Sequence, residues 1–205
     1  MPLFGQNRGM DRVTGHGATP IDLPVIVTER LRLRSFHPDD VDWVYELSLD
    51  PEMLRWVSLP VPYERNHAQF FVENIAIARA HNGTAANFVI ENAATGQPLG
   101  RIGLHRKTDT AAEVGYWLAA HARGSGVMTE AVRTACRWGF SQEGMGLRRI
   151  LWHALVGNVG SRKVTERAGF TIHSKSEIMF RRGQPSEKWS GVLIAPQSPD
   201  APRLG

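Results

Sequence analysis

Residues 113–130, EVGYWLAAHARGSGVMTE, decide how the chain folds and where a ligand binds. The first six residues have the short, apolar pattern of a strand, and the segment from Gly126 onward has helical spacing. Between them lies the turn Arg123-Gly124-Ser125-Gly126, whose glycines let a ligand approach the backbone. The first N–H groups of a helix have no internal acceptor and lie at its positive end. The sequence therefore predicts an anion-binding loop, to which Arg123 can add a charge-assisted hydrogen bond.

The segments on either side of this loop predict a mixed sheet with helices. Strand patterns recur in four further runs, at residues 28–35, 87–91, 99–105 and 149–155, and two final strands follow Phe170. Helical spacing is found at residues 38–50, 64–80, 126–140 and 161–168. The strands outnumber the helices that interrupt them, which indicates an α/β (α+β) sandwich.

The composition is that of one folded domain. The chain has 205 residues, of which 42% are hydrophobic and 21% are charged. Residues 1–23 lack periodicity and predict a flexible arm, residues 24–195 predict one domain, and residues 196–205 predict a tail. The single cysteine, Cys136, excludes an internal disulfide and a Cys-rich zinc site, and its place on an apolar helical stripe predicts a small buried hydrophobe.

Charge and hydropathy restrict the expected partners. The net charge is +4 without a basic cluster, so no nucleic-acid partner is expected. Arg30, Arg32 and Arg34 alternate along one strand, which we interpret as a solvated face. The N-terminal residues lack the apolar segment of a signal peptide, and no run approaches the roughly 20 apolar residues that span a membrane. We therefore expect a cytoplasmic protein without a membrane partner.

The motif Arg123-Gly124-x-Gly126-x-x-Thr129-Glu130-Ala131 resembles the acyl-CoA pyrophosphate loop of the GNAT N-acetyltransferases, in particular their RimJ/RimL branch. Further blocks resemble this branch in the expected order, namely Thr28-Glu29-Arg30-Leu31-x-Leu33-Arg34, residues 113–118, Asn158-x-x-Ser161, and Glu166-Arg167-Ala168-Gly169-Phe170. The resemblance implies a GNAT fold, a mixed and mostly antiparallel sheet splayed at its central strands with helices on both faces. It also implies that acetyl-CoA binds between the parting strands, without a metal.

The same resemblance implies which residues contact acetyl-CoA. They lie at the end of the strand, in the loop and after the next strand, and are Leu118, Ala119, Arg123, Gly124, Ser125, Gly126, Val127, Met128, Thr129 and Asn158. Two alternatives remain open. The glycines could serve a plain tight turn, and Asn158 could instead cap the helix at 161–168.

Acetyl transfer to an amine needs a group that takes the amine proton and an acid for the departing thiolate. Glu113 matches a position where the branch often carries a carboxylate facing the acceptor, so it is the candidate base, acting directly or through water. Ser161 matches the family serine near the cofactor sulfur and could donate to the thiolate or cap its helix. Many GNATs place a tyrosine acid after the Asn, but Val164 and Thr165 occupy that region here.

Three other residues have side chains that could contribute to the site. Trp56, expected in the loop between the first two helices, is predicted to shape the acceptor pocket. His105 and His153 are expected to be core or surface histidines.

The resemblance implies direct acetyl transfer from acetyl-CoA to a primary amine in a ternary complex, with a protein N-terminal α-amine as the acceptor. One alternative is a small amine such as an antibiotic, a polyamine or an amino-acid derivative. An alternative of another class is a CoA-binding module without catalysis. The final strands could also pair between the subunits of a homodimer.

Overall fold

The computed structural model describes residues 19–196. Most of the expected N-terminal arm and nearly all of the expected tail therefore lie outside the described residues. Within residues 19–23, Ile21 and Leu23 pack against the main core, and the Ile21 N–H donates to the Ala80 carbonyl at 2.9 Å.

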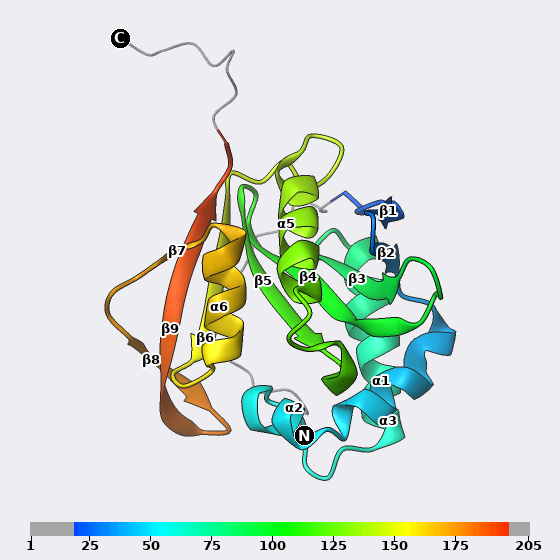
Figure 1. The fold of residues 1–205 in the computed structure, drawn as a ribbon, viewed down its shortest axis with the longest axis horizontal. Coiled ribbons are helices and arrows are strands. Elements are labelled where there is room, and N and C mark those ends of the chain that lie inside the picture. The colour runs from blue at the N-terminus through cyan, green and yellow to red at the C-terminus, as the bar shows by residue number, and fades with distance from the viewer. Residues whose placement is uncertain (1–18, 197–205) are drawn as a thin grey trace.

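One twisted sheet forms the framework of the described chain (Figure 1). Its strands are β1 (Ile26–Val27), β2 (Leu31–Ser35), β3 (Ala85–Asn92), β4 (Pro98–Thr108), β5 (Ala111–Leu118), β6 (Arg149–Leu155), β7 (Thr171–Ile172), β8 (Glu177–Arg181) and β9 (Gln184–Ile194). They follow the order β1-β2-β3-β4-β5-β6-β9-β7, with β8 paired to β9. The strands predicted at residues 87–91, 99–105 and 113–118 are confirmed as β3, β4 and β5, which pair antiparallel in a meander.

The sheet parts at its centre. Strands β5 and β6 are parallel and pair over only three positions, from Ala111 opposite Arg149 to Glu113 opposite Leu151. Every other strand pair of the described sheet is antiparallel. The expected splay is therefore confirmed, and Glu113 stands at the point where the two strands separate.

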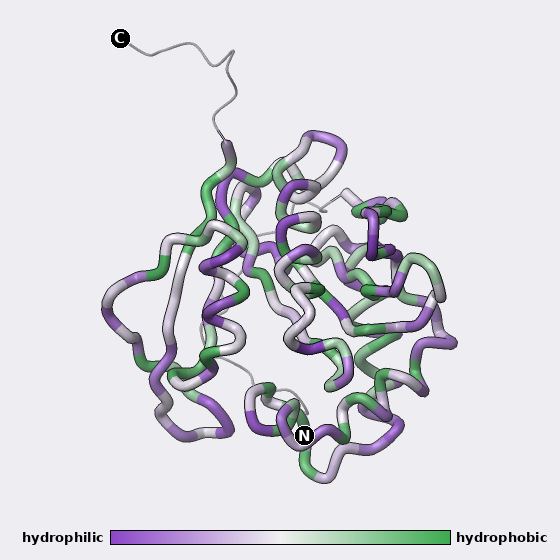
Figure 2. Tube along the Cα trace, viewed as in Figure 1, coloured by the Kyte–Doolittle hydropathy of each residue, from purple (hydrophilic) through white to green (hydrophobic). Residues whose placement is uncertain are grey.

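Helices cover both faces of the sheet. The α-helices are α1 (Val41–Ser48), α2 (Pro51–Trp56), α3 (Arg65–Phe70), α4 (Ala78–His81), α5 (Val127–Phe140) and α6 (Val159–Ala168); a π-helical segment, η2 (Phe71–Ile77), joins α3 to α4. In Figure 1, α5 and α6 lie in front of the strands. Side chains of β3 alternate between the two faces, so Phe88 and Ile90 pack in the core beneath α5, whereas Val89 packs in a second core with α1 and α3. Figure 2 shows hydrophobic residues along the central strands and hydrophilic ones in outer loops such as the β8–β9 turn.

Helix α2 differs from the sequence prediction. Pro51 was expected to end the first helix and to lead into a loop, but it occupies the first turn of a new helix. Proline is well suited to that position because it lacks an N–H that would otherwise be unpaired. The Asp50 carboxylate caps the helix by accepting from the Glu52 N–H at 2.9 Å. Trp56 is therefore the last residue of a helix and does not lie in a loop.

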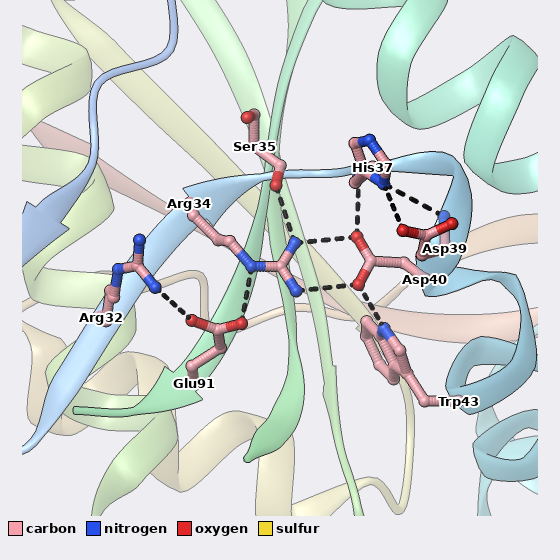
Figure 3. Close-up of polar contacts among 8 residues, drawn as sticks. All are labelled: Arg32, Arg34, Ser35, His37, Asp39, Asp40, Trp43 and Glu91. Carbon is pink, nitrogen blue, oxygen red and sulfur yellow. Dashed lines mark hydrogen bonds and ion pairs between the residues drawn. The ribbon is translucent and has the colours of Figure 1, made fainter. Parts of the chain in front are cut away.

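The arginines of β2 form ion pairs (Figure 3). Arg32 is exposed, as a solvated face implies, whereas the partly buried Arg34 corrects that interpretation. Arg34 donates to both carboxylate oxygens of Asp40 at 2.8 Å and to Glu91 at 2.6 Å. Trp43 Nε1 also donates to Asp40 at 2.7 Å, and Arg32 lies 3.3 Å from Glu91. Both carboxylates are buried, so this network fixes β2 to β3 and to the start of α1.

Candidate active site

A cleft of about 820 Å³ opens where β5 and β6 separate. Strand alternation divides its lining between two faces of the sheet. Tyr116 points to the face covered by α5 and α6, whereas Trp117 packs with α1 and α3 on the opposite face. Glu113 and Gly115 share the parity of Trp117 along β5 and line the cleft. The cleft is therefore lined by side chains from both faces of the sheet.

The loop before α5 presents a row of free main-chain donors. Gly124 and Gly126 have φ angles of +77° and +80°, a left-handed conformation that strongly favours glycine. Among the described residues, none accepts a hydrogen bond from the N–H groups of residues 124–129. These donors lie at the positive end of a 14-residue helix, so the loop fits a phosphate group.

The predicted cofactor residues are only partly brought together. Those that line the cleft are Leu118, Arg123, Gly124, Gly126, Val127, Met128, Thr129 and Asn158; Ala119 and Ser125 do not. The Ala119 N–H donates to the Leu99 carbonyl at 2.8 Å, and Ser125 Oγ donates to the Ala122 carbonyl at 2.8 Å. Both of these residues shape the loop.

Arg123 is engaged away from the loop. Its Nη2 forms an ion pair with Asp50 and donates to the Leu118 carbonyl at 3.0 Å. A bond from Arg123 to a phosphate would require the guanidinium to leave these partners. The side chain as it stands links the end of β5 to the start of α2.

A hydrogen-bonded group of three side chains lies on the α6 side of the cleft. Ser161 Oγ accepts from Trp152 Nε1 at 3.1 Å and shares a hydrogen bond with the Tyr116 hydroxyl at 3.0 Å. Asn158 Oδ1 accepts from the Ser161 N–H at 3.1 Å, so Asn158 is the helix cap and Ser161 is not. Burial raises the pKa of Tyr116, which keeps its hydroxyl protonated.

Sequence analysis did not identify Tyr116. The resemblance implies a tyrosine after Asn158, and the chain has none there. Tyr116 reaches Ser161 from β5, a strand 45 residues earlier in the chain. The available signal was strand alternation, which places Tyr116 on the face opposite Glu113 and Trp117.

On the other side, Glu113 joins two basic side chains. Its carboxylate lies 3.3 Å from His153 Nδ1 and 3.0 Å from Lys107 Nζ. Burial opposes ionisation, but the His153 hydrogen bond and the charges of His153 and Lys107 outweigh it and lower the pKa of Glu113 to about 2. His153, which could face the cleft from its strand although a core or surface position was expected, lines the cleft beside Glu113.

One end of the cleft is bounded by α2 and by the β8–β9 hairpin. Trp56 lines the cleft, and a Cβ on Gly157 would lie 3.6 Å from its ring. Arg181 of β8 donates to the carbonyls of Leu54 and Val57 at 3.2 and 3.3 Å. Segments far apart in the sequence thus close one end of the cleft.

Cys136 takes no part in the cleft. It is buried on α5, and burial raises the pKa of its thiol to about 12. The predicted core position is confirmed. Residues 19–196 contain no group of three or more His, Cys, Asp or Glu side chains that could hold a metal ion. No helix within these residues is long and apolar enough to cross a membrane.

Comparisons with known proteins agree with this geometry. A family model described as an acetyltransferase (GNAT) domain matches residues 30–171. A Bacillus subtilis protein named "Putative ribosomal N-acetyltransferase YdaF" is 28% identical over 169 residues, which cover 73% of this chain and 82% of that protein.

Solved structures share the fold. RimL, a ribosomal L7/L12 α-N-protein acetyltransferase solved with coenzyme A, superposes with a TM-score of 0.71 at 20% identity over 83% of this chain and 97% of its own. An acetyltransferase from Salmonella typhimurium that modifies the N-terminal serine of ribosomal protein L7/L12 gives a TM-score of 0.72 at 19% identity, covering 84% and 99%.

Proposed function

The chain belongs to the GNAT acetyltransferases, and on that premise we propose that its acceptor is the N-terminal α-amine of a protein. The enzyme is an acetyl-CoA-dependent N-acetyltransferase of the RimJ/RimL-like branch. Two relatives with named ribosomal acceptors support a protein substrate, and such an acceptor would place the reaction in the cytoplasm.

The observation that carries the proposal is the position of the Glu113–His153 pair. It stands where β5 and β6 part, and the same cleft is lined by Gly124 and by residues 126–129, whose N–H groups are free. These N–H groups would hold the pyrophosphate of acetyl-CoA, and the thioester supplies the carbonyl carbon that the amine attacks. An amine that enters from the Glu113 side meets a proton acceptor at this gap.

Glu113 and His153 have different roles in removing the proton from the amine. A carboxylate with a pKa near 2 holds a proton poorly at neutral pH, so Glu113 serves chiefly to orient the imidazole and to stabilise its cation. His153 takes the amine proton, as histidine does most often among general bases. On the opposite face, Ser161 donates to the departing thiolate, and Tyr116 and Trp152 hold its hydroxyl in place.

The substrate class can be tested by measuring CoA release from acetyl-CoA. Peptides with a free N-terminus, the same peptides with an acetylated N-terminus, and small amines form the panel. We expect release with the free peptides alone. Acetylation of small amines without acetylation of any peptide would overturn the protein acceptor.

The roles of the pair can be separated by pH profiles. His153→Gln should lower kcat by about 10²–10⁴-fold and remove the acid limb of the profile. Glu113→Gln should also lower kcat but keep that limb, because the imidazole is still present without the carboxylate that orients it. His173→Gln, an exposed histidine outside the cleft lining, is the control. If Glu113→Gln abolishes the limb and His153→Gln keeps it, Glu113 is the base itself.

A further inference from the structure

Arg101 is a cation on the acceptor side of the cleft without an acidic partner. Its Nη1 donates to Asn87 Oδ1 at 2.9 Å, and its Nε is buried without a hydrogen bond. In the part of the chain that the structure covers, no carboxylate lies within 4.0 Å of the guanidinium, and no residue accepts a hydrogen bond from Nη2. Arg101 lines the cleft, and its Nη2, unlike the buried Nε, is available to a ligand there.

Two glycines keep the space around this guanidinium clear. A Cβ on Gly103 would lie 2.7 Å from Arg101 Nη1, so a larger residue at 103 would displace the arginine. A Cβ on Gly115 would lie 3.9 Å from Arg101 Nη2, which leaves the surface beside that atom bare. The rings of Phe71 and Trp117 lie 5.2 and 5.8 Å from the guanidinium carbon and hold it from the other side.

The charge of Arg101 is not balanced locally. Burial and the charge of Arg79 lower its pKa to about 10, which leaves it protonated at neutral pH. His105, 3.5 Å away, has its pKa lowered to about 3 by burial and by the two arginines, so it is neutral. Glu113, on the same face, is already paired with Lys107 and His153. A buried charge is costly unless it is paired, so the site favours an anion supplied by a ligand.

We propose that the acceptor carries a carboxylate side chain near its N-terminus and that Arg101 binds this group. The proposal rests on the proposed function, because the α-amine must lie at Glu113. The guanidinium of Arg101 lies beside Gly115, with Nη1 3.5 Å from His105, the residue opposite Glu113. Gly115 and Glu113 are two strand residues apart, which corresponds to about 7 Å. An extended peptide with its amine at Glu113 therefore brings the side chain of one of the residues that follow toward Arg101.

The test compares peptides that carry Asp or Asn at position 2, 3 or 4, using the wild type and Arg101→Gln. In the wild type, we expect one of the three Asp peptides to have a KM about 10- to 100-fold lower than the Asn peptide with the same substitution site, because it gains a hydrogen bond between charged groups. The two peptides should have similar kcat. Arg101→Gln should remove this preference by raising the KM of the Asp peptide alone. Arg79→Gln, which removes a nearby charge outside the cleft lining, should keep the preference.

A second measurement does not depend on acetylation. Glutarate should raise the melting temperature of the wild type more than the neutral glutaramide does, and Arg101→Gln should lose this difference while it keeps its affinity for CoA. Equal responses of wild type and variant, in either measurement, would overturn the proposal. A glutarate response confined to the wild type, with no peptide acetylated, would retain the anion site and overturn the protein acceptor.

Discussion

At the scale of single residues, Arg34 carries a large share of the stability of the N-terminal strand. Arg34→Met would leave the carboxylates of Asp40 and Glu91 buried without their main partner. Breaking such a pair costs about 3–5 kcal/mol, so we expect a loss near 3 kcal/mol in the free energy of unfolding. Arg32→Met is the matched control, because Arg32 contacts the same Glu91 but is 46% exposed. Its loss should stay below about 1 kcal/mol. Urea unfolding that gives equal losses would contradict this assignment.

The same network predicts a dependence of stability on pH. Burial raises the pKa of Asp40, but hydrogen bonds from Arg34, His37 and Trp43 outweigh it and lower the pKa below its ordinary value of 3.8. A depressed pKa in the folded state adds stability that is complete above the ordinary value and is lost as the pH falls below it. Asp40→Asn should therefore show a smaller fall in unfolding free energy between pH 5 and pH 3 than the wild type. Parallel pH curves would show that Asp40 contributes nothing to acid unfolding.

Cys136 gives a prediction about the covalent chemistry. A thiol with a pKa near 12 in the core is a poor nucleophile, so Cys136→Ala should leave kcat unchanged. Its unfolding free energy should fall by about 1 kcal/mol. Mass spectrometry after incubation with acetyl-CoA alone should show no acetyl adduct on the wild type. A stable adduct would mean that the thiol reaches the cofactor.

At the scale of elements, the junction of β5, the loop and α5 determines cofactor affinity. A Cβ on Gly126 would meet only Arg30, at 3.7 Å, so Gly126→Ala is opposed mainly by the positive φ angle. Gly126→Asp adds a negative charge beside the free N–H groups and should weaken CoA binding by about tenfold or more, which is 1.4 kcal/mol. Gly146→Asp is the control, since Gly146 also has a positive φ of +60° but does not line the cleft. Calorimetry that finds unchanged affinity in Gly126→Asp would contradict the loop assignment.

The sequence predicted elements where the pattern of side chains is local. Strand β6 was predicted at its observed bounds, because Ile150, Trp152 and Ala154 alternate with less buried residues. Helix α2 was missed because Pro51 can end one helix or begin the next, and only the Asp50 cap decides between them. The helix at 64–80 was predicted in position, but its π-helical part was not. The buried residues of this segment recur every four positions, at Ala68, Val72, Ala76 and Ala80. This spacing is longer than the 3.6 residues per turn of an α-helix and is consistent with the π-helical part.

The candidate site could be predicted only in part, for a physical reason. The loop and Glu113 stand out because glycine positions and a resemblance mark them in the linear sequence. Tyr116, His153 and Arg101 join the site because β5 and β6 part after Glu113, which turns alternate side chains into the gap. Where two strands separate is a property of the folded sheet, so no local pattern reveals it.

At the scale of the whole molecule, the proposed direct transfer requires both substrates in the cleft at once. Cofactor donors and Ser161 lie on the α5 and α6 side, and the Glu113–His153 pair lies at the gap to the other side. Direct transfer then needs a ternary complex, so initial rates with both substrates varied should give intersecting double-reciprocal lines. Ser161→Ala should lower kcat by about tenfold or more, toward the low end of acid catalysis. Parallel lines would indicate a covalent intermediate.

The alternation along β5 also has a consequence for how the enzyme can change. Tyr116 lies on the face of the sheet covered by α5 and α6, and its neighbours Gly115 and Trp117 lie on the opposite face. Under the proposed function, adjacent residues of β5 therefore face different substrates. Under the proposed function, substitution at the odd-numbered positions of β4 and β5 other than Glu113 changes the choice of acceptor and leaves the residues on the acetyl-CoA side unchanged. A lineage could then acquire new acceptors in single steps without losing acetyl-CoA, and an engineer could do the same with a library confined to those positions.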